Sequence, residues 1–183
     1  MTDDDTWVGG WDALCVTLVR GLTPMEAAEA IALADFQEYE NRVSAANWVF
    51  ASDDYDRSQF ATGEVDGWTF IWEENGWQGV AREEGRLLAQ AAELYSMFWN
   101  VNAAMTFLAG RDGRVIRHFD PLFHDDLAPA LDIGPAFDAE AGLDWPGAPC
   151  TSGLALLSAV TNVAPVDPSL LDAAGVRFWA HRF

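Results

Sequence analysis

The sequence contains no lysine. Its ten basic residues are all arginine and are set against 29 Asp and Glu residues, which gives a formal net charge of −19. Between His118 and Val176 the chain has nine acids and no arginine. Proteins bind nucleic acids mainly through Lys and Arg, which displace counterions from the phosphates, so this composition argues against DNA or RNA binding. The charge indicates either a solubilising surface or one that attracts a basic protein partner.

Long apolar runs and cysteines are scarce as well. No run approaches the roughly 18 apolar residues that a membrane-spanning helix needs. Residues 1–5 are acidic where a signal peptide would be basic. The two cysteines, Cys15 and Cys150, form no disulfide framework. We therefore expect a cytoplasmic protein with no membrane partner.

Motifs for catalysis and cofactor binding are also missing. There is no GxSxG nucleophile elbow, and residues 151–153 are better explained as a helix cap. The glycines of residues 9–10 and 76–79 lack the lysine and the strand–loop–helix context of a phosphate-binding loop. Acids are so abundant that no pair of carboxylates stands out. We therefore expect no catalytic residue and no cofactor.

What is present is a chain of ordinary domain size with an apolar core. It has 183 residues, of which 50% are hydrophobic and 13% aromatic, and this composition excludes disorder as the overall state. We expect residues 1–183 to form a single α+β domain. Its antiparallel sheet should have about five to six strands, with helices packed on one face. Residues 121–150, rich in Pro, Gly, Asp and Ala, should form a long irregular excursion.

Helices are predicted from spacing and from caps. Thr23-Pro24-Met25-Glu26 is typical of a helix start, with a capping box and proline in the first turn. This helix should run to about Glu38. The other helical segments are residues 83–95, residues 151–161 with Thr151 or Ser152 as cap, and a short helix from Asp167.

Strands are predicted from apolar runs, alternation and turn dipeptides. The run at residues 12–19 fits a strand or the core of a helix, and its β-branched residues favour the strand. Asn75-Gly76 and the segment 111–114 are typical of hairpin turns. The remaining predicted strands are residues 45–52, 67–72, a return strand from Trp77, 97–109 and 115–119.

A polar row on the best predicted strand is one candidate site. In residues 97–109 the apolar residues alternate, which leaves Asn100, Asn102 and Thr106 on the opposite face. Asparagine is unfavourable in strands because its side chain competes for backbone hydrogen bonds. The row therefore lies on a solvated face or bonds to a covering loop, or else it lines a polar concavity.

Tryptophan supplies the second group of candidates. The chain has nine, and Trp68, Trp72 and Trp77 lie in or next to one predicted hairpin. Exposed tryptophans would form a sugar platform or a protein hot spot, whereas buried ones would be core. The core interpretation is favoured. In the binding interpretation, Trp68, Trp72 or His118 would border the polar concavity.

One cluster has the residue types of a metal site. His118, Asp120 and His124, followed by Asp125 and Asp126, have the spacing H-x-D-x3-H-D-D. Imidazole and carboxylate together suit zinc, manganese or iron. The alternative interpretation is a half-buried strand histidine followed by a solvated acidic turn.

Three blocks resemble an uncharacterised family of small actinobacterial proteins. They are CVTLVRGLTPMEA at residues 15–27, GWT…ENGWQG at residues 67–79, and NVNA…F…DGR…FDP at residues 100–121. The resemblance covers most of residues 13–124. It implies no activity, because the family is a domain of unknown function.

The sequence favours a non-enzymatic, acidic protein-binding module with a basic protein partner. An immunity, antitoxin-like or regulatory role fits, since many toxins that cut nucleic acids present basic surfaces. The alternatives are a metal-dependent hydrolase that uses His118, Asp120 and His124, and a small-ligand module with a tryptophan-lined pocket.

Overall fold

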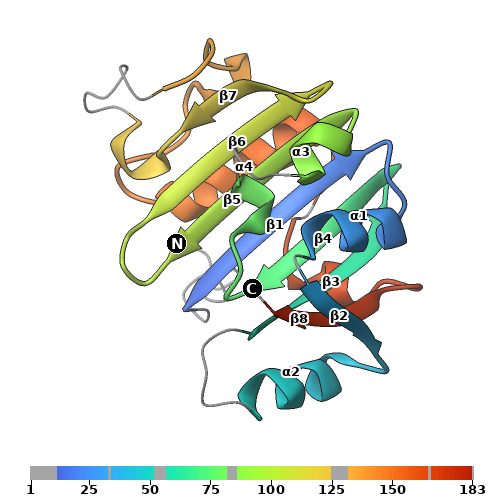
Figure 1. Cartoon of the computed structure of the whole chain (residues 1–183). Coiled ribbons are helices and arrows are strands. Elements are labelled where there is room, and N and C mark those ends of the chain that lie inside the picture. The colour runs from blue at the N-terminus through green and yellow to red at the C-terminus, as the bar shows by residue number, and fades with distance from the viewer. Residues whose placement is uncertain are drawn as a thin grey trace.

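The protein is a single α+β domain, and its described residues form one antiparallel sheet of eight strands, ordered β2-β8-β3-β4-β1-β5-β6-β7 (Figure 1). The computed structural model describes residues 12–32, 34–51, 57–81, 86–124, 132–164 and 166–182. The strands are β1 (Ala13–Arg20), β2 (Ala34–Tyr39), β3 (Arg57–Val65), β4 (Trp68–Glu74), β5 (Glu93–Asn100), β6 (Met105–Arg111), β7 (Arg114–Phe119) and β8 (Arg177–Arg182).

Helices cover both faces of the sheet. They are α1 (Pro24–Ile31), α2 (Arg42–Phe50), α3 (Arg86–Gln90) and α4 (Pro149–Thr161), with the 3-10 helices η2 (Gln78–Val80), η3 (Pro121–Phe123), η4 (Asp138–Glu140) and η5 (Pro168–Asp172). We call the side covered by α1, α3 and η2 the α1 face, and the side covered by α4 the α4 face. Helix α2 packs against β8, β3 and β2 (Figure 1). No helix within the described residues is long and apolar enough to cross a membrane.

Strand β1 is apolar because it is buried on both sides. Leu14, Val16 and Leu18 contribute to the core on the α4 face, while Cys15 and Val19 contribute to the core on the α1 face. A strand in the middle of a sheet covered on both faces favours apolar residues at successive positions, not only at alternate ones. The buried Thr17 is the exception, and its hydroxyl lies within hydrogen-bond distance, 2.7 Å, of Ser96 Oγ. The prediction of a strand at residues 12–19 is therefore confirmed.

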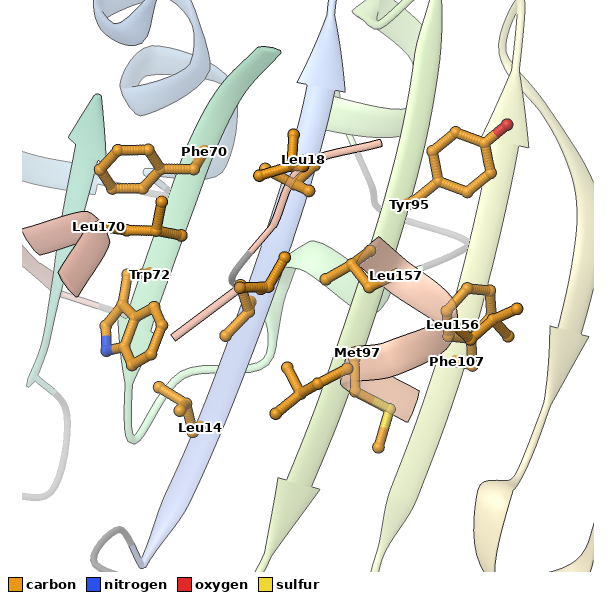
Figure 2. Close-up of a cluster of buried hydrophobic side chains, with 14 of the residues drawn as sticks. Leu14, Leu18, Phe70, Trp72, Tyr95, Met97, Phe107, Leu156, Leu157 and Leu170 are labelled. Atoms are coloured by element: carbon orange, nitrogen blue, oxygen red, sulfur yellow. The ribbon is translucent and has the colours of Figure 1, made fainter. Parts of the chain in front are cut away.

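The larger core lies under α4 (Figure 2). Leu156 and Leu157 of this helix belong to one cluster with Met97 of β5, and Leu170 of η5 joins the same cluster. Burial of each such side chain stabilises the fold by about 1.5–3 kcal/mol. This packing fixes the second half of the chain against the sheet formed mainly by the first.

The predicted sheet of five to six strands with helices on one face is wrong. The sheet has eight strands, and helices lie on both of its faces. Strand β2 lies where the first helix was expected to continue to Glu38, because α1 ends at Ile31 and Ala32 turns into extended backbone. Strand β2 pairs with β8, about 140 residues further along the chain, and β3 lies between β8 and β4.

Three further element predictions are wrong for local reasons. The strand expected at residues 45–52 is helix α2, whose N-cap Asn41 accepts a hydrogen bond from the N–H of Ser44 at 2.9 Å. The helix expected at residues 83–95 is α3, which ends at Gln90 before β5 begins. The strand expected at residues 97–109 is divided by a turn at residues 101–104 into β5 and β6.

The hairpin expected around Asn75-Gly76 does not form, because β4 pairs with a different strand. Strand β4 pairs with β3 through the turn at Asp66-Gly67, and the chain after Asn75 forms η2 instead of a return strand. The capping box at Thr23 and Glu26 and the β6–β7 hairpin are confirmed. Helix α4 is confirmed too, although its N-cap is Ala148 and not Thr151 or Ser152. Described residues within 121–148 contain only η3, η4 and one isolated bridge.

Candidate functional site

A hollow of about 460 Å³ lies where β1 ends and α1 begins. Its lining comes from residues 19–23 at the end of β1, from Glu26 of α1, and from residues 64–69 around the β3–β4 turn. We call it the Trp68 hollow. Its lining contains Trp68, one of the candidate tryptophans, together with several charged side chains.

Two turns shape the Trp68 hollow. At the β3–β4 turn, Asp66 and Gly67 have φ angles of 48° and 79°, the left-handed pair that a tight hairpin requires. At the other wall, the Thr69 hydroxyl donates a hydrogen bond of 2.7 Å to the carbonyl oxygen of Leu22. This bond ties the segment that leads into α1 to the start of β4, so the walls are held at a fixed separation.

The Trp68 indole is a buried wall of the hollow. It is 2% exposed, and its Nε1–H donates a hydrogen bond of 3.0 Å to the Thr161 carbonyl oxygen on α4. The Arg20 guanidinium lies 4.1 Å from the ring centroid and also contacts Glu93 at 3.3 Å. Arg20, the one cation among the described residues of the lining, is therefore already engaged with an aromatic ring and a carboxylate.

Three carboxylates line the same hollow. Glu26 accepts hydrogen bonds from the N–H and hydroxyl of Thr23, both at 2.8 Å, and these bonds lower its pKa. The carboxylates of Glu64 and Asp66 are exposed and make no hydrogen bond or ion pair within the described part of the chain. With three carboxylates and one engaged guanidinium, the hollow attracts cations.

The polar row predicted as a binding site does not lie beside this hollow. The Asn100 side-chain oxygen accepts hydrogen bonds from the N–H of Asn102 at 2.9 Å and of Ala104 at 3.0 Å, and so holds the β5–β6 turn. Thr106 pairs with Phe98, a residue packed on the α1 face, whereas Trp68 belongs to the core of the α4 face. The two candidate groups are therefore on opposite sides of the sheet.

The three candidate tryptophans differ in exposure. Trp68 and Trp72 are 2% and 1% exposed and belong to the core under α4. Trp77, at the start of η2, is 50% exposed. Trp68 and Trp72 therefore have a role in the core that needs no ligand, as the favoured interpretation expected.

The predicted metal ligands His118, Asp120 and His124 are not grouped, and Asp125 and Asp126 lie outside the described residues. His118 pairs with Leu108, which packs on the α1 face. The imidazole of His124 instead stacks on Trp145 of the α4 face, with ring centroids 4.5 Å apart. Asp120 caps η3 by accepting a hydrogen bond of 2.9 Å from the N–H of Leu122. Among the described residues, no three His, Cys, Asp or Glu side chains are arranged to hold a metal ion.

The partners of His124 form a cluster that the sequence did not reveal. Arg117 on β7 makes a bidentate ion pair with Glu140 of η4, at 2.9 Å and 2.8 Å, and a second pair with Asp132 at 3.1 Å. His124 Nε2 lies 2.9 Å from the same Glu140 carboxylate. These contacts hold Asp132 and Glu140, in the irregular segment after β7, against β7 at the edge of the sheet. No short-range spacing connects Arg117 to Glu140, so sequence patterns gave no signal for the pair.

A second buried group lies beneath η2 on the α1 face. Glu73 is 2% exposed, and its two oxygens accept hydrogen bonds from the N–H groups of Gln78 at 2.9 Å and Gly79 at 2.8 Å. It pairs with Cys15 on the neighbouring strand β1, and the Cys15 Sγ lies 3.3 Å from Ser96 Oγ. Burial raises the pKa of Glu73 to about 7. The sequence signal for this group is short: Glu73 is followed by the turn dipeptide Asn75-Gly76 and by Gly79.

Comparison with known proteins gives a family but no activity. No curated protein and no solved structure matches the chain. One family model matches residues 2–129, a range that includes the whole lining of the Trp68 hollow and the buried Glu73 group, while α4 and β8 lie outside it. Because this match covers more than half of the chain, the protein belongs to the family of unknown function DUF6461.

Proposed function

We propose that this protein is a non-enzymatic binding module for a basic protein, and that an arginine or lysine side chain of the partner enters the Trp68 hollow. The observation that carries the proposal is the pair of exposed carboxylates, Glu64 and Asp66, which have no partner within the described residues. A cation placed between them would gain charge-assisted hydrogen bonds that the free protein does not make.

The net charge of −19 supports the same kind of partner. A strongly acidic protein attracts a basic one at long range and speeds their encounter, while local pairing decides the register of the complex. Proteins with such basic surfaces include toxins that cut nucleic acids, so an immunity or antitoxin-like role is part of this proposal. The free thiols of Cys15 and Cys150 support a reducing, cytoplasmic location.

The test compares two double variants that change the net charge equally. Glu64→Gln with Asp66→Asn removes the carboxylates of the hollow, while Glu29→Gln with Asp138→Asn removes two exposed carboxylates elsewhere. The probe is a fluorescent oligoarginine peptide, followed by anisotropy. Asparagine tolerates the positive φ at position 66, so the turn should survive.

We expect the hollow variant to lose about tenfold in affinity, equivalent to about 1.4 kcal/mol, and the control variant to change little. Equal weakening by both variants would mean that the peptide binds the general charge, and the proposal for the hollow would fail. The same pair of variants, used as bait in a pull-down from the native host, would show whether a natural basic partner depends on the hollow.

A further inference from the structure

The chain that follows β4 lies on the α1 face and is attached there through one side chain. We call residues 76–81, which include η2, the strap. The N–H groups of Gln78 and Gly79 donate hydrogen bonds to the two oxygens of Glu73, at 2.9 Å and 2.8 Å. The other hydrogen bonds of the strap stay within it, so among the described residues these two bonds join it to the rest of the chain. A single carboxyl group therefore holds the strap by hydrogen bonding.

Polar side chains lie directly beneath the strap. Cys15 and Thr17 of β1 and Ser96 of β5 are fully buried there. Ser96 Oγ lies 2.7 Å from Thr17 Oγ1 and 3.3 Å from Cys15 Sγ. A Cβ added at Gly79 would lie 2.9 Å from Ser96 Oγ and 3.0 Å from Cys15 Sγ, so the strap is in contact with this group. The strap therefore covers a thiol and two hydroxyl groups.

The packing under the strap is less apolar than the packing under its neighbours. On the same face, α1 and α3 bury apolar side chains such as Ile31 and Leu87, whereas the strap contributes Val80 to the core. Water that enters beneath the strap would hydrate Glu73 and the two hydroxyl groups, which offsets part of the cost of exposing Val80. Regions with few buried apolar contacts open at a lower free energy than the rest of a fold. We therefore expect the strap to separate from the sheet more readily than the sheet unfolds.

Among the described residues, no cation compensates the charge of Glu73 when this residue ionises. Its titratable neighbour on β1 is Cys15, whose own thiol pKa is raised by burial, and its register partner on β3 is the apolar Phe60. The strap and the facing residue of β5 are uncharged, and the acids of α1, Glu26 and Glu29, are exposed. Burial raises the pKa of Glu73 to about 7, although the hydrogen bonds from the strap oppose the rise. The ionised carboxylate therefore gains more from water than from the two N–H groups.

We propose that the strap is a pH-controlled cover, closed over Cys15 while Glu73 is protonated and open once Glu73 has released its proton to water. The open state gives solvent access to a thiol that the closed state hides. This device goes beyond the proposed function and does not rest on it. Glu73 lies near the end of β4, whereas the Trp68 hollow is lined by residues at the start of that strand. Binding at the hollow does not require the strap to move.

The direction of the pH dependence follows from the two states of Glu73. In the closed state its pKa is about 7, and in the open state the hydrated carboxyl group returns toward 4.5. Below pH 4.5 both states are protonated, so pH has no effect on opening there. Between the two values only the open state is ionised, and opening becomes more favourable by up to about tenfold per pH unit. The opening constant should be about 50-fold larger at pH 8 than at pH 5.

The experiment is hydrogen exchange of the full chain, read for each amide by NMR at pH 5 and pH 8. Exchange rates divided by the intrinsic rates of the same amides give opening constants. We expect the Gly79 N–H to open at least about tenfold more often than the Leu18 N–H, which lies in β1 between β4 and β5 and reports unfolding of the sheet. The Gly79 constant should rise with pH in the parent and in Glu29→Gln, which alters an exposed acid of α1, but not in Glu73→Gln.

Alkylation by iodoacetamide tests whether opening uncovers Cys15. In Cys150→Ser, Cys15 is the only thiol of the chain. The alkylation rate of the folded chain, divided by the rate in urea at the same pH, corrects for ionisation of the thiol. This ratio should rise from pH 5 to pH 8 by about the same factor as the Gly79 opening constant. It should stay constant when Glu73→Gln is added to Cys150→Ser.

Equal opening constants for Gly79 and Leu18 would overturn the proposal, because the strap would then open only with the whole fold. A Gly79 constant that is unchanged or falls between pH 5 and pH 8 would overturn it too, since ionised Glu73 would then hold the strap closed. If the constant rises and the alkylation ratio does not, the strap does not cover Cys15 and the proposal fails. None of these three results depends on Glu73→Gln, so the proposal can be rejected even if that variant does not fold.

Discussion

The N–H of Gly79 donates a hydrogen bond of 2.8 Å to Oε1 of Glu73, which fixes η2 over a fully buried carboxyl group. The position of Gly79 is set by close approach. A Cβ added there would lie 2.0 Å from Thr17 Oγ1 and 2.9 Å from Ser96 Oγ. Only glycine lets the backbone come close enough to the sheet to donate this bond.

Gly79→Ala should therefore destabilise the protein by about 1–3 kcal/mol, the usual cost of overpacking a filled core. Urea unfolding measures the loss. In a Thr17→Ala background the added methyl group gains space, so the same substitution should cost clearly less. Equal losses in both backgrounds would show that contact with Thr17 is not the cause.

Glu73 should make stability depend on pH around neutrality. Burial raises its pKa in the folded protein from 4.5 to about 7, so the folded state binds a proton that the unfolded state has released between these values. The contribution of this group is fully present below pH 4.5 and is lost as the pH rises through 7. The loss is about 3 kcal/mol at most.

The measurement compares the parent with Glu73→Gln by urea unfolding at pH 5 and pH 8. We expect the parent to lose more stability than Glu73→Gln between the two values, because glutamine does not titrate. Glu64→Gln, at an exposed position, serves as the control and should follow the parent. Parallel curves for the parent and Glu73→Gln would contradict the raised pKa.

Local signals in the sequence identified the parts of the fold that local interactions make. The capping box joins Thr23 to Glu26 over three residues, and Asp112-Gly113 closes the β6–β7 hairpin, so both are visible in a short window. Strand β2 is different. Its pairing with β8 joins residues 34–39 to residues 177–182, and no local pattern encodes a contact at that separation.

The candidate site was found only in part for the same reason. Trp68 was a binding candidate because of its residue type, although the core interpretation was favoured, and its burial agrees with the favoured interpretation. The element that covers it, α4, is more than 80 residues away, so the sequence could not identify the contact. Glu64 and Asp66 are ordinary in a chain with 29 acids. They became candidates only when the β3–β4 turn placed them beside a hollow.

The Arg117–Glu140 ion pair should be necessary for stability. Both residues are less than 5% exposed, and removal of one partner leaves the other charge buried without compensation. Burial alone would raise the pKa of Glu140, but hydrogen bonds from Arg117, the Phe137 N–H and His124 hold it below the ordinary value. The carboxylate is therefore ionised when the pair forms.

Arg117→Met should cost about 3 kcal/mol in urea unfolding. Arg114→Met, at an exposed position of the same strand, should stay within about 0.5 kcal/mol of the parent. A small change in the free energy of unfolding of Arg117→Met would show that the attraction within the pair only offsets the cost of removing its two charges from water. In that case the excursion would be held by the packing of Trp145 and Phe119.

The two asparagines considered as binding residues, Asn100 and Asn102, should differ in how much their side chains contribute to stability. Asn100 accepts two backbone N–H groups in the β5–β6 turn, whereas Asn102 contributes only its backbone N–H to that turn. Asn100→Thr should destabilise the protein by about 1 kcal/mol through loss of these bonds, while Asn102→Thr should be close to neutral. Oligoarginine binding should be unchanged in both variants, because neither residue lines the Trp68 hollow. Loss of binding in a folded Asn102→Thr variant would move the site to this turn, away from Glu64 and Asp66.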